Sequence, residues 1–213
     1  MPPLPEPPIV YVVDDDPALS RSLRFLLESV GWEVQLFASA AAFLPLAKVL
    51  TRPCCLLLDI RMPGMSGLEL QQILQEQDCA VPILFMTGHA DVSMAVQAMK
   101  SGACDFLEKP FNDQKVLDAV AAAVRLCAGM LEEAQRRATA QKVLTTLSAR
   151  EGEVARLVAL GRPNKLIASA LEISEKTVHI HRQHVMEKTC LSSAAELARL
   201  MLRADPDAFD EPL

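Results

Sequence analysis

Between residues 9 and 127, short apolar runs alternate with stretches in which apolar residues recur every three or four positions. The runs have the length of buried strands, and the spaced stretches, such as residues 19–30, have the periodicity of amphipathic helices. Strands are expected over Ile9–Val13, Glu33–Phe37, Cys54–Asp59, Val81–Met86 and Asp105–Leu107. The regular alternation of strand and helix predicts an α/β fold with a doubly wound, five-stranded parallel sheet.

Residues that favour helix starts and stops lie between these strands. Pro17 follows Asp16 where the first helix should begin, and Ser66 with Glu69 has the spacing of a capping box. Pro45 is expected to end the second helix early, because proline lacks the backbone N–H that a helix interior uses. N-caps are expected at Asp16, Ser66, Asp91 and Asn112. A unit of about 120 residues built in this way has flavodoxin-like size.

Beyond the fifth strand the pattern becomes entirely helical. The fifth helix should end near Cys127, and the polar residues 128–143 indicate a helical linker, since no Pro or Ser cluster interrupts them. Four short helices follow, and the tight turn at residues 172–174 suggests a helix-turn-helix. The expected helix starts are Ser148, Pro163, Ser174 and Ser193. The expected division is a first domain at 8–127, a linker at 128–143 and an all-α four-helix domain at 144–204.

Charge is spread unevenly along the 213 residues, whose net charge is −6. Residues 1–130 carry 15 acidic and 9 basic residues, whereas residues 131–203 carry 8 acidic and 12 basic residues. Four further acids follow after residue 203. The overall charge argues against a protein that coats nucleic acid uniformly, but the basic second module is suited to an anionic partner.

The six cysteines form neither a CxxC pair nor a zinc-ligand pattern with histidine. We expect reduced, mostly buried thiols in a cytoplasmic protein. The Pro-rich residues 1–8 lack the basic start and apolar core of a signal peptide. No apolar run reaches the length of about 20 residues that spans a membrane, so no membrane association is expected.

Charged and polar residues stand where four of the predicted strands end. Because parallel strands place their carboxyl ends at one rim, these side chains should gather there. Crowded carboxylates repel one another, and a hard cation such as Mg²⁺ relieves that repulsion. A carboxylate beside such a cation and an ammonium group can act as a nucleophile towards phosphorus. The residues are Asp14, Asp15, Asp59, Thr87 and Lys109.

Four segments resemble, in order and spacing, the motifs of a bacterial two-component receiver domain. They are Val13–Asp16, Leu58–Gly64, Met86–His89 and Phe106–Phe111. The resemblance implies that Asp59 is the phosphoacceptor and that Asp14, Asp15, Asp59 and the backbone carbonyl of Arg61 bind Mg²⁺. It also implies a phosphate and switch role for Thr87, Phe106 and Lys109, with a cis peptide bond between Lys109 and Pro110.

Simpler interpretations exist for several of these residues. Asp16 is better explained as a helix cap than as a ligand, and His89 as an exposed loop residue than as a general base. Phe106 is compatible with plain core filling. A phosphatase of the haloacid dehalogenase type also uses an aspartate nucleophile, but it needs a second acid two residues later, where this chain has Arg61.

The second module resembles a LuxR-type DNA-binding domain. The segments that carry this resemblance are residues 147–151, 158–168 and 173–182, within a match over about residues 145–203. A receiver joined to such a domain is similar to the FixJ and NarL family of response regulators. On the helix from Glu175, Val178 and Val185 are expected to face inward.

The opposite face of that helix is expected to enter the major groove of DNA. The resemblance implies that His179, Ile180 and Gln183 read base edges. Further DNA contacts, mainly to phosphates, are expected from Asn164, Lys165, Ser174, Lys176, Thr177, Arg182 and Lys188. A merely solvated basic face, a protein-binding module and a metal site at His179, His181 and His184 are the alternatives.

Together the two resemblances imply a phosphorylation-activated transcription regulator rather than an enzyme. The implied partners are a sensor histidine kinase, promoter DNA, RNA polymerase and a second copy of the phosphorylated chain. The dimer surface is expected on residues 92–101 and 105–107, where Lys100 and Asp105 could pair. The kinase, the signal, the operator and the sign of regulation are not encoded in any motif of the chain.

Overall fold

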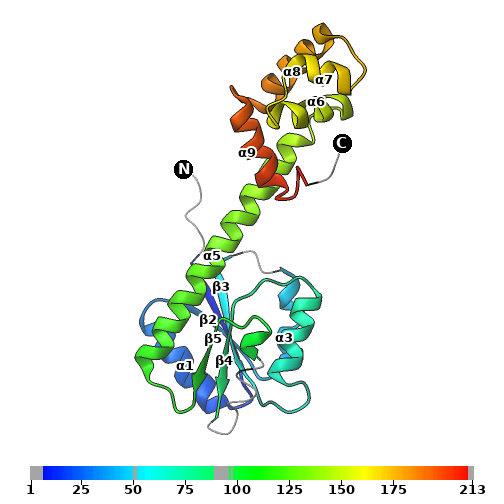
Figure 1. Cartoon of the computed structure of the whole chain (residues 1–213). Coiled ribbons are helices and arrows are strands. Elements are labelled where there is room, and N and C mark those ends of the chain that lie inside the picture. The colour runs from blue at the N-terminus through cyan, green and yellow to red at the C-terminus, as the bar shows by residue number, and fades with distance from the viewer. Residues whose placement is uncertain (1–6, 50–51, 89–95, 97, 211–213) are drawn as a thin grey trace. The chain divides into compact units, whose positions relative to one another are not determined.

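The computed structural model describes residues 7–49, 52–88, 96 and 98–210 (Figure 1). The chain divides into two compact units, Met1–Leu131 and Glu132–Leu213. Each unit has its own buried apolar core. Each core is built from residues of one unit only.

The first unit contains a five-stranded parallel sheet with the order β2-β1-β3-β4-β5. This is the predicted doubly wound fold. The strands are β1 (Ile9–Val13), β2 (Glu33–Phe37), β3 (Cys54–Asp59), β4 (Ile83–Thr87) and β5 (Asp105–Glu108). All residues of β1, β3 and β4 are buried, as expected for central strands with helices on both faces.

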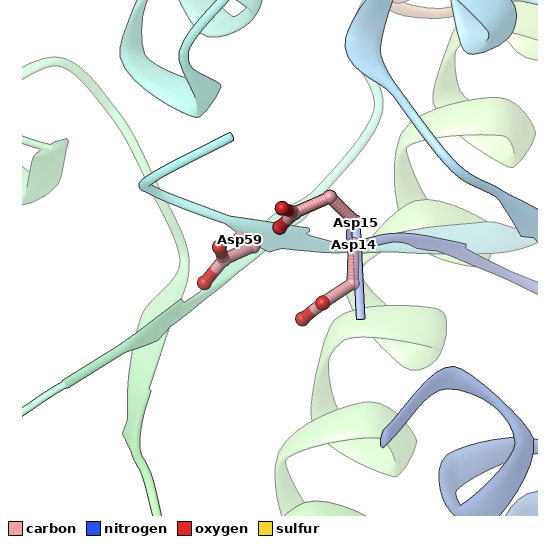
Figure 2. A group of neighbouring side chains, drawn as sticks. All are labelled: Asp14, Asp15 and Asp59. Carbon is pink, nitrogen blue, oxygen red and sulfur yellow. The ribbon is translucent and has the colours of Figure 1, made fainter. Parts of the chain in front are cut away.

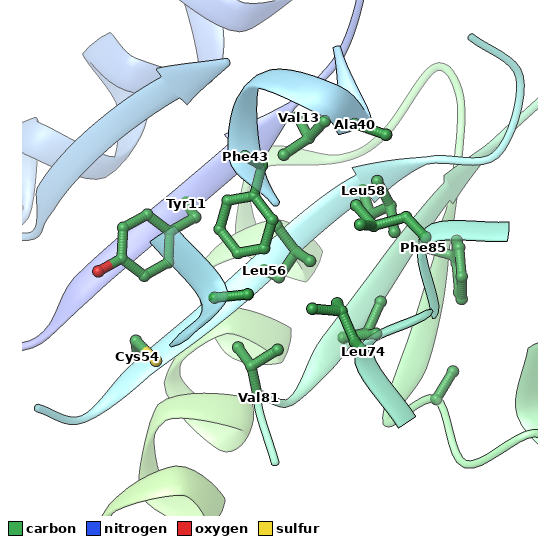
Figure 3. Close-up of a cluster of buried hydrophobic side chains, with 14 of the residues drawn as sticks. Tyr11, Val13, Ala40, Phe43, Cys54, Leu56, Leu58, Leu74, Val81 and Phe85 are labelled. Atoms are coloured by element: carbon green, nitrogen blue, oxygen red, sulfur yellow. The ribbon is translucent and has the colours of Figure 1, made fainter. Parts of the chain in front are cut away.

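Alternate residues of the strands supply two apolar layers. Tyr11 and Val13 belong to the layer shown in Figure 3, which α2 and α3 cover, whereas Val10 and Val12 belong to the layer beneath α1 and α5. The helices are α1 (Pro17–Ser29), α2 (Ala40–Phe43), the 3₁₀ helix η1 (Leu46–Val49), α3 (Gly67–Glu76) and α5 (Asp113–Leu144). Most of the helix expected after Asp91 lies outside the described residues, but residues 96 and 98–100 are helical.

Three of the residues predicted to cap helix N-termini do so. Asp16 accepts hydrogen bonds from the backbone of Ala18 at 2.8 Å and of Leu19 at 3.3 Å, so it caps α1. Ser66 and Glu69 form the expected capping box of α3. Asn112 accepts a hydrogen bond from the Gln114 N–H at 2.8 Å and thereby caps α5.

Three details differ from the sequence-based expectation. Strand β4 begins at Ile83 rather than Val81, since Pro82 has no N–H to donate, although its carbonyl accepts from Leu56 N at 2.9 Å. Val30, the last residue of the amphipathic stretch 19–30, is the C-cap of α1 and is 52% exposed. Helix α5 does not end near residue 127 but continues unbroken to Leu144, because neither proline nor a capping turn interrupts it.

The second unit contains the four predicted short helices. They are α6 (Ala149–Ala159), α7 (Asn164–Ala170), α8 (Glu175–Thr189) and α9 (Ala194–Ala204). Their apolar faces enclose one core that includes Val154, Ile167, Val178 and Leu197. Within the described residues, no helix is long and apolar enough to cross a lipid bilayer.

Gly67 holds α3 against the end of β3. A Cβ atom at this position would lie 2.2 Å from the carbonyl oxygen of Asp59 and 3.1 Å from Cγ of Leu58. The Gly67 N–H also donates to the Ile60 carbonyl at 3.0 Å. Only glycine therefore permits this close approach between the helix start and the strand end.

We expect Gly67→Ala to lower the free energy of unfolding of the first unit by about 1–3 kcal/mol, as overpacking typically does. The matched control is Gly129→Ala, because no atom lies within 4 Å of a Cβ there. Within a helix that change should stabilise by about 0.5–1 kcal/mol. Urea titration of the full chain measures both, and equal stability of the two variants would contradict the packing argument.

Candidate functional site

Three carboxylates meet at the carboxyl ends of β1 and β3 (Figure 2). Asp14 and Asp15 directly follow β1, and Asp59 is the last residue of β3. One carboxylate oxygen from each lies within 4.8 Å of the others. Asp14 and Asp59 are buried, whereas Asp15 is exposed, so the group faces solvent on one side only.

Lys109 directly follows the edge strand β5, and its side chain reaches the aspartate cluster. Its ammonium group donates to Oδ2 of Asp14 and to Oδ1 of Asp59, both at 2.8 Å. The other oxygen of Asp14 accepts from the N–H of Asp16 at 2.8 Å. Asp14 is thus fixed by both oxygens, while the charge of Lys109 is shared between two acids.

Burial is the main influence on the ionisation of this group. It raises the pKa of Asp59, Lys109 opposes that rise, and the charges of Asp14 and Asp15 add to it. Burial by itself would lower the pKa of Lys109, but its hydrogen bonds to Asp14 and Asp59 outweigh this and leave that pKa raised. The rim therefore holds excess negative charge beside one firmly protonated lysine.

The donor set fits a hard divalent cation. Mg²⁺ prefers carboxylate and carbonyl oxygens and keeps several waters, and the exposed Asp15 leaves the cluster open on its solvent side. Arg61 follows Asp59 by two residues, and its side chain is exposed. Asp16, by contrast, uses its carboxylate to cap α1.

The two expected switch residues stand on β4 and β5. Thr87 is buried, and its hydroxyl donates to the carbonyl of Gly88 at 3.2 Å rather than to a carboxylate. Phe106 is 46% exposed, so core filling does not explain it. The Lys109–Pro110 peptide bond is cis, as the resemblance implied. His89 lies outside the described residues.

Gly67 was not among the residues singled out from the sequence, although it positions the Asp59 backbone. A glycine at the first helical position, next to a strand that ends in a functional carboxylate, is the signal that could have found it. A Cβ at Gly67 would meet the Asp59 backbone itself, so the glycine belongs to the architecture of the rim.

In the second unit, α8 divides into an inner and an outer face. Val178 and Val185 are buried in the core. The predicted outer residues Lys176, His179, Ile180 and Gln183 are all exposed, and Ile180 is 44% exposed. Apolar side chains can contact the thymine methyl group in the major groove, so an exposed isoleucine is compatible with a DNA-facing surface.

Other predicted DNA-binding residues have partners within the unit. The Ser174 hydroxyl accepts from the N–H of Thr177 at 3.0 Å and caps α8. Arg182 donates to Oδ1 of Asn164 at 3.2 Å and so ties α8 to the start of α7. Lys165, the neighbour of Asn164, is exposed.

Lys188 donates to Oε2 of the buried Glu151 at 2.6 Å. That hydrogen bond, together with the N–H of Ser148, lowers the pKa of Glu151 to about 2. Lys188 therefore fastens α8 to α6 whether or not it also contacts DNA. Among the described residues, the group of side chains arranged to hold a metal is the aspartate cluster, so the histidines of α8 gain no support as a metal site.

Comparison with known proteins agrees with this geometry. Residues 10–121 match the family described as response regulator receiver domain. Residues 145–201 match the family described as bacterial regulatory proteins, luxR family. The two matches correspond to the sheet unit and to the helical unit.

Two curated relatives come from Bradyrhizobium diazoefficiens. Nodulation protein W is 46% identical over 192 residues, which cover 90% of this chain and 84% of the relative. Transcriptional regulatory protein FixJ is 43% identical over 198 residues, 92% of this chain and 95% of the relative.

Among solved structures, the response regulator StyR is similar, with a TM-score of 0.78 and 42% identity over 91% of this chain and 98% of that one. A receiver joined to a DNA-binding domain implies a cognate sensor kinase and promoter DNA. The chain therefore belongs to the two-component response regulators with a LuxR-type DNA-binding domain, and it is a phosphorylation-dependent regulator of transcription.

Proposed function

We propose that Asp59 is the phosphoacceptor of this regulator. The observation that carries the proposal is the ammonium group of Lys109 shared by Asp14 and Asp59 at 2.8 Å, beside a third carboxylate. An oxygen of Asp59 forms a bond to the phosphorus of the donor, and the bond from phosphorus to the leaving group breaks. Asp59 is suited to this role because it stands at the end of a fully buried strand, at the solvent-facing rim.

Asp14, Asp15, Asp59 and the carbonyl of Arg61 are the residues proposed to hold Mg²⁺. The cation would neutralise charge on the transferring phosphoryl oxygens. Lys109 contributes a second positive charge from the opposite side of Asp59. When Asp59 gains the dianionic phosphoryl group, the ammonium of Lys109 can pair with a phosphoryl oxygen in place of Oδ1 of Asp59 and keep its contact with Asp14.

The proposed switch begins at Thr87. Its hydroxyl, now bonded to the Gly88 carbonyl, turns to donate to a phosphoryl oxygen. Beside it lies a mainly apolar cavity of about 390 Å³, lined by Thr87, Val96, Met99 and Phe106 among others. The half-exposed ring of Phe106 can occupy that space once Thr87 has moved, which changes the surface of β5.

The outer face of α8 is proposed to read DNA. His179, Ile180 and Gln183 face base edges, and Asn164, Lys165, Lys176, Thr177, Arg182, Lys188 and Ser174 position the helix against the phosphates. Arg182, Ser174 and Lys188 do so from side chains already fixed within the unit. This arrangement reduces the conformational entropy lost on binding.

We propose that residues 8–127 form the receiver domain, 128–143 the linker and 144–204 the DNA-binding domain. The protein is proposed to act in the cytoplasm, with a sensor kinase, promoter DNA and RNA polymerase as its partners.

Phosphorylation is proposed to promote a two-fold dimer through residues 92–101 and 105–107. Two DNA-binding modules then engage half-sites together, which raises avidity by about 10²–10⁴.

Acetyl phosphate with Mg²⁺ is expected to phosphorylate Asp59 alone, as mapped by mass spectrometry of the intact chain and its peptides. Asp59→Asn should abolish the label. Asp118→Asn, an exposed acid on α5, is the matched control and should leave it unchanged. Label that persists in Asp59→Asn would falsify the assignment.

Two substitutions on α8 should separate base reading from phosphate binding. Gln183→Ala should change the preferred sequence, since a base contact is worth about 1–3 kcal/mol. Lys176→Ala should weaken binding to all sequences alike and reduce the salt slope by about one. Binding titrations on specific and random duplexes at several salt concentrations measure both.

Lys188→Ala is the informative comparison for these two variants. It removes the ammonium partner of the buried Glu151 and leaves the Ser148 N–H in place, so it should lower the thermal stability of the second unit as well as its affinity for DNA. Lys176→Ala should leave that stability unchanged. If Gln183→Ala and Lys176→Ala weaken specific and random DNA equally, the division of roles is wrong.

Phosphorylated full-length protein is expected to sediment as a dimer and unmodified protein mainly as a monomer. The alternative is that the acidic receiver covers the basic module until it is phosphorylated. Residues 132–213 would then bind DNA more tightly than the unmodified whole chain. A phosphorylated monomer that binds paired half-sites tightly would contradict the dimer mechanism.

A further inference from the structure

A cluster of thiols lies at the end of the sheet opposite the aspartates. Cys54 opens β3, Cys79 follows α3, and Cys127 belongs to α5. All three line a cavity of about 290 Å³. Cys54, labelled in Figure 3, precedes Asp59 by five residues of β3. That is roughly 16 Å along a strand, so the cavity is separate from the proposed phosphorylation site.

Two of these thiols are in direct contact. The Sγ atoms of Cys54 and Cys127 lie 3.9 Å apart, and the residues are 1% and 4% exposed. Cys79 instead donates to the carbonyl of Ala47 at 3.3 Å. Among the described residues, no group of metal-ligating side chains includes these cysteines, so the geometry favours thiol chemistry over metal binding.

We propose that Cys54 and Cys127 are a redox-sensitive pair, which a hydroperoxide converts into a disulfide. The thiolate of Cys127 attacks the peroxide, the O–O bond breaks, and an alcohol or water leaves. The sulfur of Cys54 then attacks the resulting sulfenic acid, the S–O bond breaks, and water leaves. The two thiols lose two electrons and two protons in total, and the peroxide is reduced.

The order of the two steps follows from the contact between the sulfurs. Either sulfur can donate the hydrogen bond between them; this contact lowers the pKa of Cys127, whereas the same contact and burial raise the pKa of Cys54. The thiolate is the reactive form, and a thiol with a pKa near ambient pH attacks best. The cavity gives a small peroxide access to the pair.

The disulfide would join elements that are 73 residues apart in sequence. It would tie the start of β3 to α5, the helix that continues into the second unit as far as Leu144. The sulfurs must approach each other to about 2.05 Å for the bond to form. Because thiols are reduced again in the cytoplasm, the bond would be transient there.

The test uses the full-length wild-type chain. The protein is treated with dilute hydrogen peroxide, unfolded, alkylated with N-ethylmaleimide, and digested without reductant for mass spectrometry. We expect a crosslinked peptide that joins Cys54 to Cys127 and disappears with dithiothreitol. A peptide that joins Cys54 to Cys79, or oxidation confined to the exposed Cys190, would overturn the proposal.

Two variants complete the experiment. Cys127→Ser should abolish the crosslink and leave Cys54 alkylated, while Cys104→Ser, which changes a half-buried thiol outside this cavity, should leave the crosslink intact. The oxidised wild type should also unfold at a higher temperature than the reduced form, because the closed loop restricts the unfolded chain. If Cys127→Ser does not fold, the peptide map of the wild type still decides between the outcomes.

Discussion

The shared ammonium group of Lys109 is the interaction on which the receiver rim depends. At an effective dielectric constant of about 20, two unit charges 4 Å apart interact by about 4 kcal/mol. Asp14 and Asp59 would repel each other on that scale if both were ionised alone. Lys109 contacts both at 2.8 Å, so its two attractions offset the repulsion. The parallel sheet makes this possible, because it brings the ends of β1, β3 and β5 to one edge.

The features that the sequence predicted correctly are those with local causes. Asp16, Ser66 and Ser148 cap helices because their side chains reach backbone N–H groups two or three residues ahead. The gathering of the aspartates followed from strand direction alone. Two features were missed for different reasons. Gly67 matters only because α3 meets Asp59 in space. Residues 128–143 are helical as expected, but the helix end expected near Cys127 is absent because the linker continues α5 without a break.

The same distinction explains what sequence reasoning could not resolve in the second unit. Spacing separated the buried Val178 from the exposed His179 correctly. It could not show that Lys188 is bonded to Glu151, because those residues are 37 positions apart and meet only when α6 packs against α8. A basic residue of α8 can therefore stabilise the fold in addition to its proposed contact with DNA phosphates, and its substitution would change both properties.

The two sites proposed for the receiver stand at opposite ends of β3, with Cys54 at its start and Asp59 at its end. All residues between them are buried, so the strand has little freedom to transmit a gradual distortion. Coupling between the sites then requires that each modification favours one of two discrete arrangements. If oxidation and phosphorylation favour different arrangements, linkage demands that each disfavours the other by the same factor. The population of the active arrangement would then depend on the extent of oxidation and of phosphorylation together, rather than on either modification alone.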